Sequence, residues 1–311
     1  MDFINIILSS GKNAVNLALY ILLPIMIVMM FLVRLFEVYG VITWLSKLLA
    51  PLLKLFGLSG LSLIALVQMN FVSFAAPIPT LAMMEKRGVS DRHLASTLAM
   101  TLSMAQANVL YPAAALGLDF ISVLVVSILG GLIASSLTWY LFGRALSSSY
   151  LLALDYADEL KSEKRQGILA IISDTGADAF KITTGTLPML ILSLSVLGVL
   201  THVGVIDFLK AFFTPLFEKF NANENILTLI MTKFLAGGTA VTGVINDFHN
   251  KGGFDSTSIN NNAGILINAF DLPGIALLMS AGKRIAKVFI YAVPGIVVAI
   301  AIRTIIHMFC F

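Results

Sequence analysis

Long stretches of the chain consist of apolar and small polar residues without any Asp, Glu, Lys or Arg. A helix that spans a membrane needs about 20 mainly apolar residues, so each stretch of this length is a candidate for a membrane-embedded segment. The stretches without charged side chains cover residues 13–33, 55–84, 93–118, 120–143 and 182–206. Three more contain one charged residue each, namely Lys233 in 225–246, Asp271 in 256–282 and Arg303 in 288–311. This pattern predicts a chain built from membrane helices.

Four of these stretches carry helix-breaking residues near their middle. Pro and Gly interrupt helices, and non-helical backbone at membrane depth is stable only when protein buries it or it lines a wet cavity. We therefore expect re-entrant helical hairpins at "AAPIP" (75–79) and "AGGTAVTG" (236–243). The stretches with "QANVLYP" (106–112) and "NAFDLPG" (268–274) are expected to be spanning helices interrupted partway.

The two halves of the chain repeat each other. "YGVITWLSKLLAPLLKLFG" (39–57) aligns with "VGVIDFLKAFFTPLFEKFN" (203–221), and "NFVSFAAPIPTL" (70–81) aligns with "KFLAGGTAVTGV" (233–244). Internal symmetry of this kind is typical of secondary transporters. We predict an all-α integral membrane protein with two inverted repeats. Each repeat would contain a spanning helix, an amphipathic helix, a re-entrant hairpin, an interrupted helix and a second spanning helix. The predicted units are 1–145, a cytoplasmic linker at 146–178, and 179–311.

Composition excludes a soluble domain. The chain is 58% hydrophobic and 12% charged, with a mean hydropathy of +0.94, whereas soluble domains carry about 25% charged residues. The single cysteine, Cys310, leaves no disulfide framework and no cysteine-based metal site. Basic residues concentrate in the loops that lie inside if the linker is cytoplasmic, with Arg303 among the few outside. We therefore expect a multi-pass protein of the bacterial inner (cytoplasmic) membrane.

Lys233 is the most unusual side chain in this pattern. Counted from Asn225 at about 1.5 Å per residue, it lies roughly 12 Å along its helix, where a charge costs on the order of 2.5–3.5 kcal/mol. Asp271, in the interrupted helix of the same repeat, is its expected partner. The pair could bind an anionic group, relay a proton, or replace a bound sodium ion with a fixed charge. There are two alternatives without a role in transport. One is a purely structural ion pair, and the other is a lysine whose ammonium reaches the membrane surface.

Polar side chains collect at the predicted breaks. Half-helix N-termini favour anionic groups and unwound carbonyls favour cations, so such breaks form binding sites in transporters. Mutual hydrogen bonding between packed helices is the alternative for any single Ser or Thr. The predicted substrate-binding residues are Gln68, Asn70, Ser73, Thr80, Gln106, Asn108, Lys233, Thr239, Thr242, Asn268 and Asp271. No catalytic residue, metal site, enzyme motif or resident cofactor is predicted, and the candidate coupling ions are Na⁺ and H⁺.

The segments at 40–84 and 204–245 resemble the "Gate", or nucleoside-recognition, domain. That domain occurs in the spore maturation proteins A and B and in the membrane core of bacterial ferrous-iron transporters, and it is related to the core of concentrative nucleoside transporters. The chain resembles a fusion of two such domains. The resemblance implies that hairpin tips face interrupted helices across the midplane with a solute bound between them. Segments 70–80 and 233–243, with the interrupted helices near 101–108 and 262–271, would then line the site.

Two functions are compatible with the sequence. One is a secondary transporter of a small polar metabolite, namely a nucleoside, a nucleobase or an organic anion. The alternative is a non-transporting membrane subunit that supports a partner protein or an envelope or spore-maturation process. The expected partners are a small-molecule solute and the lipid bilayer. Nucleic acid is not an expected partner, because basic residues do not interleave with aromatic ones. A homodimer is compatible with the sequence but is not required by it.

Overall fold

The computed structural model describes residues 3–149, 167–205, 208, 211–212, 225–250 and 252–311. Every secondary-structure element in this part of the chain is a helix, which agrees with the predicted all-α class. Two described helical segments, Phe120–Phe142 and Lys283–Cys310, are long and apolar enough to cross a membrane by length and composition.

The first half begins with a long helix. It also contains two shorter helices that are separated by a break at the first hairpin, and one interrupted helix. The long helix consists of α1 (Phe3–Val15), the π-helical η1 (Asn16–Leu22) and α2 (Leu23–Val38). Gly40 separates it from the next helix with a left-handed φ of 73°. The remaining helices are α3 (Val41–Leu55), α4 (Gly60–Phe71), α5 (Pro77–Lys86), α6 (Asp91–Ser103), α7 (Ala107–Ala115), α8 (Phe120–Leu137) and the π-helical η2 (Thr138–Phe142).

The second half shows the same order in its described residues. Its helices are α9 (Ile168–His202), α11 (Asn225–Ala236), α12 (Gly238–Asn250), α13 (Ser256–Leu266), α14 (Leu272–Met279) and α15 (Lys283–Cys310). The pairs α4–α5 and α11–α12 occupy the predicted hairpins, and the breaks between α6 and α7 and between α13 and α14 occupy the predicted interruptions. Pro77 starts α5, where its missing N–H costs nothing. Gly237, at φ 88°, separates α11 from α12 in a conformation that favours glycine.

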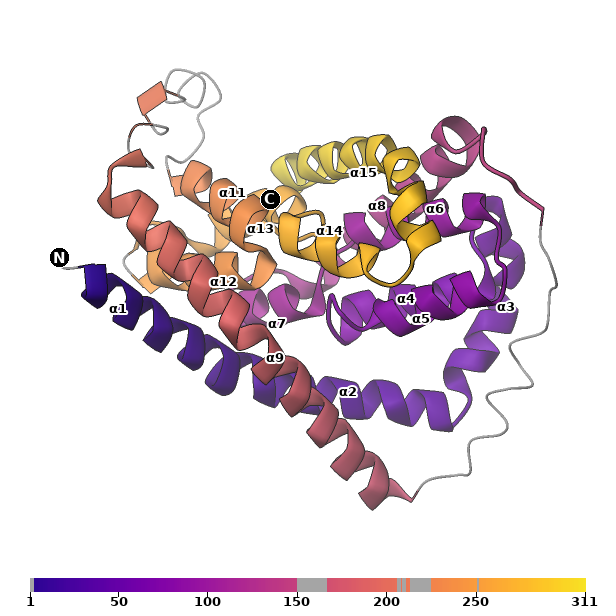
Figure 1. Cartoon of the computed structure of the whole chain (residues 1–311), viewed down its shortest axis with the longest axis horizontal. Coiled ribbons are helices and arrows are strands. Elements are labelled where there is room, and N and C mark those ends of the chain that lie inside the picture. The colour runs from indigo at the N-terminus through magenta and orange to yellow at the C-terminus, as the bar shows by residue number, and fades with distance from the viewer. Residues whose placement is uncertain (1–2, 150–166, 206–207, 209–210, 213–224, 251) are drawn as a thin grey trace.

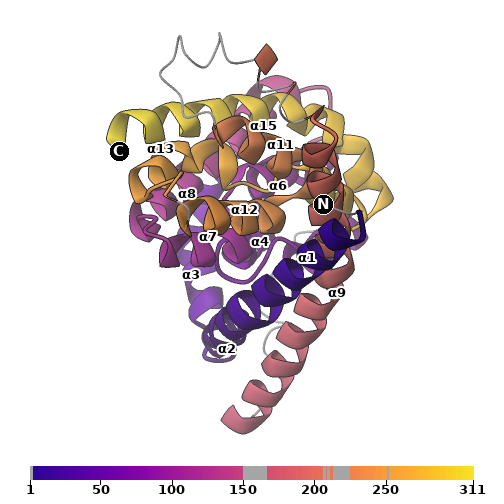
Figure 2. The ribbon, with the colours of Figure 1, turned by 90° about the vertical axis from the view of Figure 1, so that its left-hand side faces the viewer.

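The helices form a bundle flanked by two long helices. Helix α9 packs along both α1 and α2 at one side of the molecule (Figure 1), and Figure 2 shows α1 and α9 side by side. Helix α15 covers the other side and packs against α6, α8 and α13. The largest apolar core lies between α4, α5, α6, α8 and α15. The four breaks therefore lie between the α1–α2–α9 layer and α15.

Part of the predicted linker is helical. Residues 168–178, assigned to the linker, form the first turns of α9. Within α9, Asp174, Asp178 and Lys181 follow one another at spacings of four and three, which places them on one face of the helix. Most of the predicted second amphipathic helix (203–221), and residues 150–166 of the linker, lie outside the described residues. The division into repeats at 145 and 179 stays a prediction.

Candidate functional site

The predicted ion pair between Lys233 and Asp271 is present in the interior of the bundle. Lys233 lies in the last turn of α11, and Asp271 is the N-cap residue of α14. The lysine Nζ donates to the Asp271 Oδ2, and the two side chains are 0% and 2% exposed. An ion pair so far from water is stable only when further hydrogen bonds satisfy its remaining atoms.

The carboxylate of Asp271 receives three further donors. Its Oδ2 accepts from the Gln106 Nε2 at 3.1 Å and from the Gly238 backbone N at 3.2 Å, and its Oδ1 accepts from the Gly274 backbone N at 2.7 Å. Gly238 is the first residue of α12, and Gly274 lies in the first turn of α14. Helix N-termini carry a partial positive charge that favours an anion. The N-termini of α12 and α14 therefore both favour an anion at one position, and the Asp271 carboxylate occupies that position.

The hydrogen bonds continue from Asp271 to both hairpin tips. Gln106 also donates to the Asn268 carbonyl, and its Oε1 accepts from the Asn108 Nδ2 at 3.4 Å. Asn108 donates to the Thr239 Oγ1 at 2.7 Å in the second hairpin and accepts from the Phe74 backbone N at 3.3 Å in the first. Apart from Phe74, these side chains are buried. We call Gln106, Asn108, Lys233, Thr239, Asn268 and Asp271 the central network.

Asn70, which the repeat alignment matches to Lys233, lies outside the central network. Its Nδ2 donates to the Leu66 carbonyl at 2.9 Å, and its Oδ1 accepts from the Ser127 Oγ at 2.9 Å. That same Oγ accepts from the Ala105 backbone N at 2.7 Å, in the break between α6 and α7. Asn70 and Lys233 thus play parallel parts, because each hairpin supports the interrupted helix of its own half.

The remaining predicted residues have more local contacts. The Thr80 hydroxyl donates to the Gln68 Oε1 at 2.8 Å, across the first hairpin. The Thr242 hydroxyl donates to the Gly238 carbonyl within α12. The Ser73 hydroxyl is buried and has no hydrogen-bond partner within the described part of the chain. The structure therefore brings together six of the predicted residues and leaves the other five around them.

Arg303 is a functional candidate that the sequence analysis did not single out. It was counted only among the basic residues on the outer side, and the structure shows it 0% exposed in the interior of the bundle. Its guanidinium donates to the Ser103 carbonyl, and to the Ile267 carbonyl at 2.9 Å. Ser103 is the last residue of α6 and Ile267 is the C-cap of α13, so Arg303 joins the ends of both half-helices. A lone Arg near the end of an apolar run resembles a surface anchor; its spacing of four from the buried His307 was the available signal.

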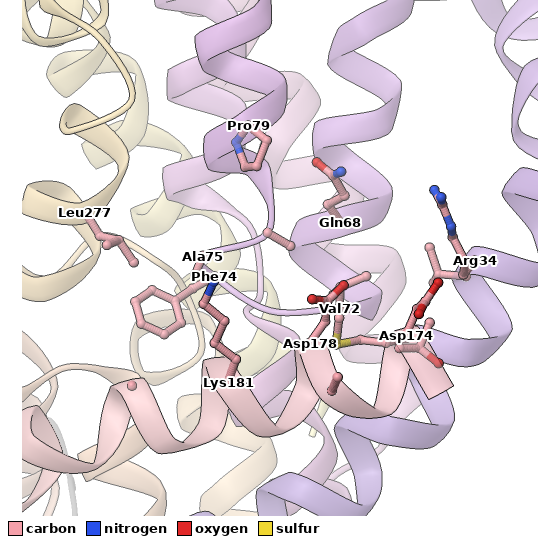
Figure 3. A pocket seen from close by; sticks show the side chains of 16 residues that line it. Arg34, Gln68, Val72, Phe74, Ala75, Pro79, Asp174, Asp178, Lys181 and Leu277 are labelled. Carbon is pink, nitrogen blue, oxygen red and sulfur yellow. The ribbon is translucent and has the colours of Figure 1, made fainter. Parts of the chain in front are cut away.

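A cavity of about 960 Å³ lies beside the first hairpin tip. Gln68, Val72, Phe74, Ala75 and Ala76 form one wall, and Leu277 of α14 contributes to the edge (Figure 3). Asp174, Asp178 and Lys181 project into it from α9, and Arg34 reaches it from α2. The cavity therefore presents both signs of charge opposite a break in the backbone. Of the predicted site residues, only Gln68 lines it.

Comparison with known proteins shows the fold. No family model matches the chain, and no curated protein matches it in sequence. Among solved structures it is similar to CNTnw, a concentrative nucleoside transporter, in an inward-facing substrate-bound state. That pair has a TM-score of 0.64 at 16% identity, over 98% of this chain and 81% of CNTnw. The chain has a CNTnw-like fold. A variant of CNTnw in an outward-facing state gives a TM-score of 0.63 at 15% identity, over 98% of this chain and 82% of that one.

The CNTnw-like fold leaves the chemistry to this chain's own residues. Within the described residues, no three His, Cys, Asp or Glu side chains lie close enough to share a metal ion. The arrangement offers two elements instead. One is a closed network of amides and charges that joins both hairpins to both interrupted helices, and the other is a charged cavity next to the first tip.

Proposed function

We propose that the protein is a secondary transporter of a small polar metabolite, namely a nucleoside, a nucleobase or an organic anion. The observation that carries the proposal is that both hairpin tips and both interrupted helices meet in one polar network, in a fold similar to that of CNTnw. Interrupted helices that end at one place are the usual means by which transporters bind a solute at the midplane.

The cavity beside the first hairpin is the proposed entrance for the solute. Its volume of about 960 Å³ is at the upper end of the range of roughly 300–1,000 Å³ for small-molecule sites. Phe74 lines the cavity, and its backbone N–H donates to Asn108 of the central network. A shift of this tip would therefore break one hydrogen bond of the network and connect it to the cavity. Arg34, Asp178 and Lys181 would select polar solutes on the way.

Uptake into proteoliposomes tests this proposal. Purified protein would be reconstituted and supplied with labelled uridine, adenine and succinate, each measured against empty vesicles. We expect accumulation of at least one of them, and a loss of at least tenfold for Lys233→Met. The matched control is Thr232→Val, because Thr232 is buried in the same helix and, among the described residues, its hydroxyl bonds only to the Thr228 carbonyl within α11. If Thr232→Val lowers uptake as much as Lys233→Met, uptake does not depend specifically on the central network.

A second function, a non-transporting membrane subunit, is favoured by one observation. The groups of the central network satisfy one another and are buried, as is expected of polar residues that only hold helices together. Such a subunit would show no uptake of any solute in the panel and would instead retain a partner protein when it is purified from its native membrane. Uptake of a panel member that requires Lys233 contradicts this second function.

A further inference from the structure

The C-terminal ends of two half-helices meet at one side chain. Helix α6 ends at Ser103 and helix α13 ends at Leu266, with Ile267 as its C-cap. The last carbonyls of a helix lack partners within it and carry a partial negative charge. Arg303 donates to one such carbonyl from each helix.

Arg303 is balanced by these carbonyls rather than by an acid. Within the described part of the chain, no carboxylate forms an ion pair with it. Lys233 and Asp271 neutralise each other, so the guanidinium supplies one uncompensated positive charge beside the central network. A single positive charge held by backbone carbonyls of two helix ends is the chemistry of a bound monovalent cation.

The neighbouring helices are shaped to admit this long side chain. A Cβ added to Gly130 of α8 would collide with the Cδ and Cγ of Arg303. A Cβ added to Gly264 of α13 would lie 2.5 Å from the Thr304 backbone and 2.7 Å from the Arg303 carbonyl carbon. Both glycines let α15 approach closely enough for the guanidinium to reach Ser103 and Ile267.

We propose that Arg303 is a built-in cation that takes the place of a mobile coupling cation at the ends of α6 and α13. Transporters with interrupted helices use such ends to coordinate Na⁺ or H⁺. A guanidinium stays charged and cannot leave, so this chain requires no sodium ion at that position. The consequence for transport, uptake without sodium, rests on the proposed function, whereas the statement about cation binding does not.

Thermal unfolding of the purified full-length protein tests the proposal. It would be followed in sodium chloride and in choline chloride at equal ionic strength. We expect the wild type to give the same Tm in both salts. Arg303→Met leaves the Ser103 and Ile267 carbonyls without their hydrogen-bond donor, so we expect the variant to have a lower Tm than the wild type in choline chloride. Sodium should then raise that Tm by several degrees in a saturable way, because a ligand of the native state stabilises it. Lys287→Met, at an exposed position of the same helix, is the matched control and should show no sodium response.

Two results would overturn the proposal. One is a sodium-specific rise in the Tm of the wild type, which would mean that a cation site exists beside Arg303. The other is an Arg303→Met variant that sodium neither stabilises nor rescues from unfolding. Uptake measured in the two salts is read separately: equal uptake supports sodium-independent transport, and sodium-dependent uptake contradicts it. Absence of uptake in both salts counts against the proposed transport alone and leaves the Tm result in force.

Discussion

The two members of the buried ion pair should not be equally costly to remove. Within the described residues, Asp271 is the only hydrogen-bond or ion-pair partner of the Lys233 ammonium. The Asp271 carboxylate has three other donors, from Gln106, Gly238 and Gly274. Asp271→Asn therefore leaves the ammonium without an anion, whereas Lys233→Met leaves a carboxylate that is still hydrogen-bonded. We expect the aspartate variant to lose more stability.

The size of the difference follows from the remaining hydrogen bonds. Breaking a buried ion pair by removing one partner costs about 3–5 kcal/mol, and a hydrogen bond to a charged group contributes about 1.5–3 kcal/mol. Because three such bonds remain on Asp271, Lys233→Met should lower the free energy of unfolding by about 3 kcal/mol or less, which is the lower limit of that cost. Asp271→Asn should lower the free energy of unfolding by about 5 kcal/mol, since nothing replaces the lost charge. The double variant buries no isolated charge and should lose less than the sum of the two.

Equilibrium unfolding of the four proteins in denaturant measures these free energies and the coupling between the two sites. A coupling energy above about 1.5 kcal/mol is expected, in the upper half of the range for contacting pairs. The reasoning fails if Lys233→Met is the more destabilising variant, or if the two losses add. Either result would mean that the ammonium has another acceptor or that the helix N-termini do not hold the carboxylate.

Two further predictions concern helix contact and capping. Gly264→Ala should cost about 1–3 kcal/mol by overpacking α13 against α15, whereas Gly176→Ala on α9, which meets nothing within 4 Å, should be neutral or stabilising. Thermal unfolding measures both, and equal effects would contradict the close contact. The Ser122 hydroxyl and backbone N–H hold the pKa of the exposed N-cap Asp119 below its ordinary value. Asp119→Ala should therefore destabilise most above about pH 4. This effect should disappear as the pH falls through the lower folded-state pKa, and a cost independent of pH would contradict it.

The breaks were predictable because Gly and Pro act locally. Pro77 lies where α5 begins and Gly237 lies between α11 and α12, and the pairing of Lys233 with Asp271 followed from the high cost of an isolated charge at that depth. These inferences need only the chain itself and the properties of the membrane, so the sequence alone was sufficient for them.

The parts of the site that the sequence did not reveal depend on tertiary packing. The position of Arg303 is decided by space beside Gly130 and by two distant helix ends, and none of these is near it in sequence. Asp174 and Asp178 fall in the predicted linker, and their charges alone do not distinguish a loop from an exposed helix face. Only the packing of α9 along α2, with the first hairpin on the other side of the cavity, makes them part of a cavity wall.

The position of Arg303 also has a consequence for how the protein is made. Helix α15 follows both α6 and α13 in the chain, so the ribosome produces the two carbonyl ends long before it produces the guanidinium that joins them. Until α15 is inserted, water, lipid headgroups or a membrane chaperone must satisfy these ends. Arg303 must then move from the aqueous phase into the interior as its helix docks. Completion of the polar interior is therefore a late event in biogenesis, and a chain released before position 303 would be a substrate for membrane quality control.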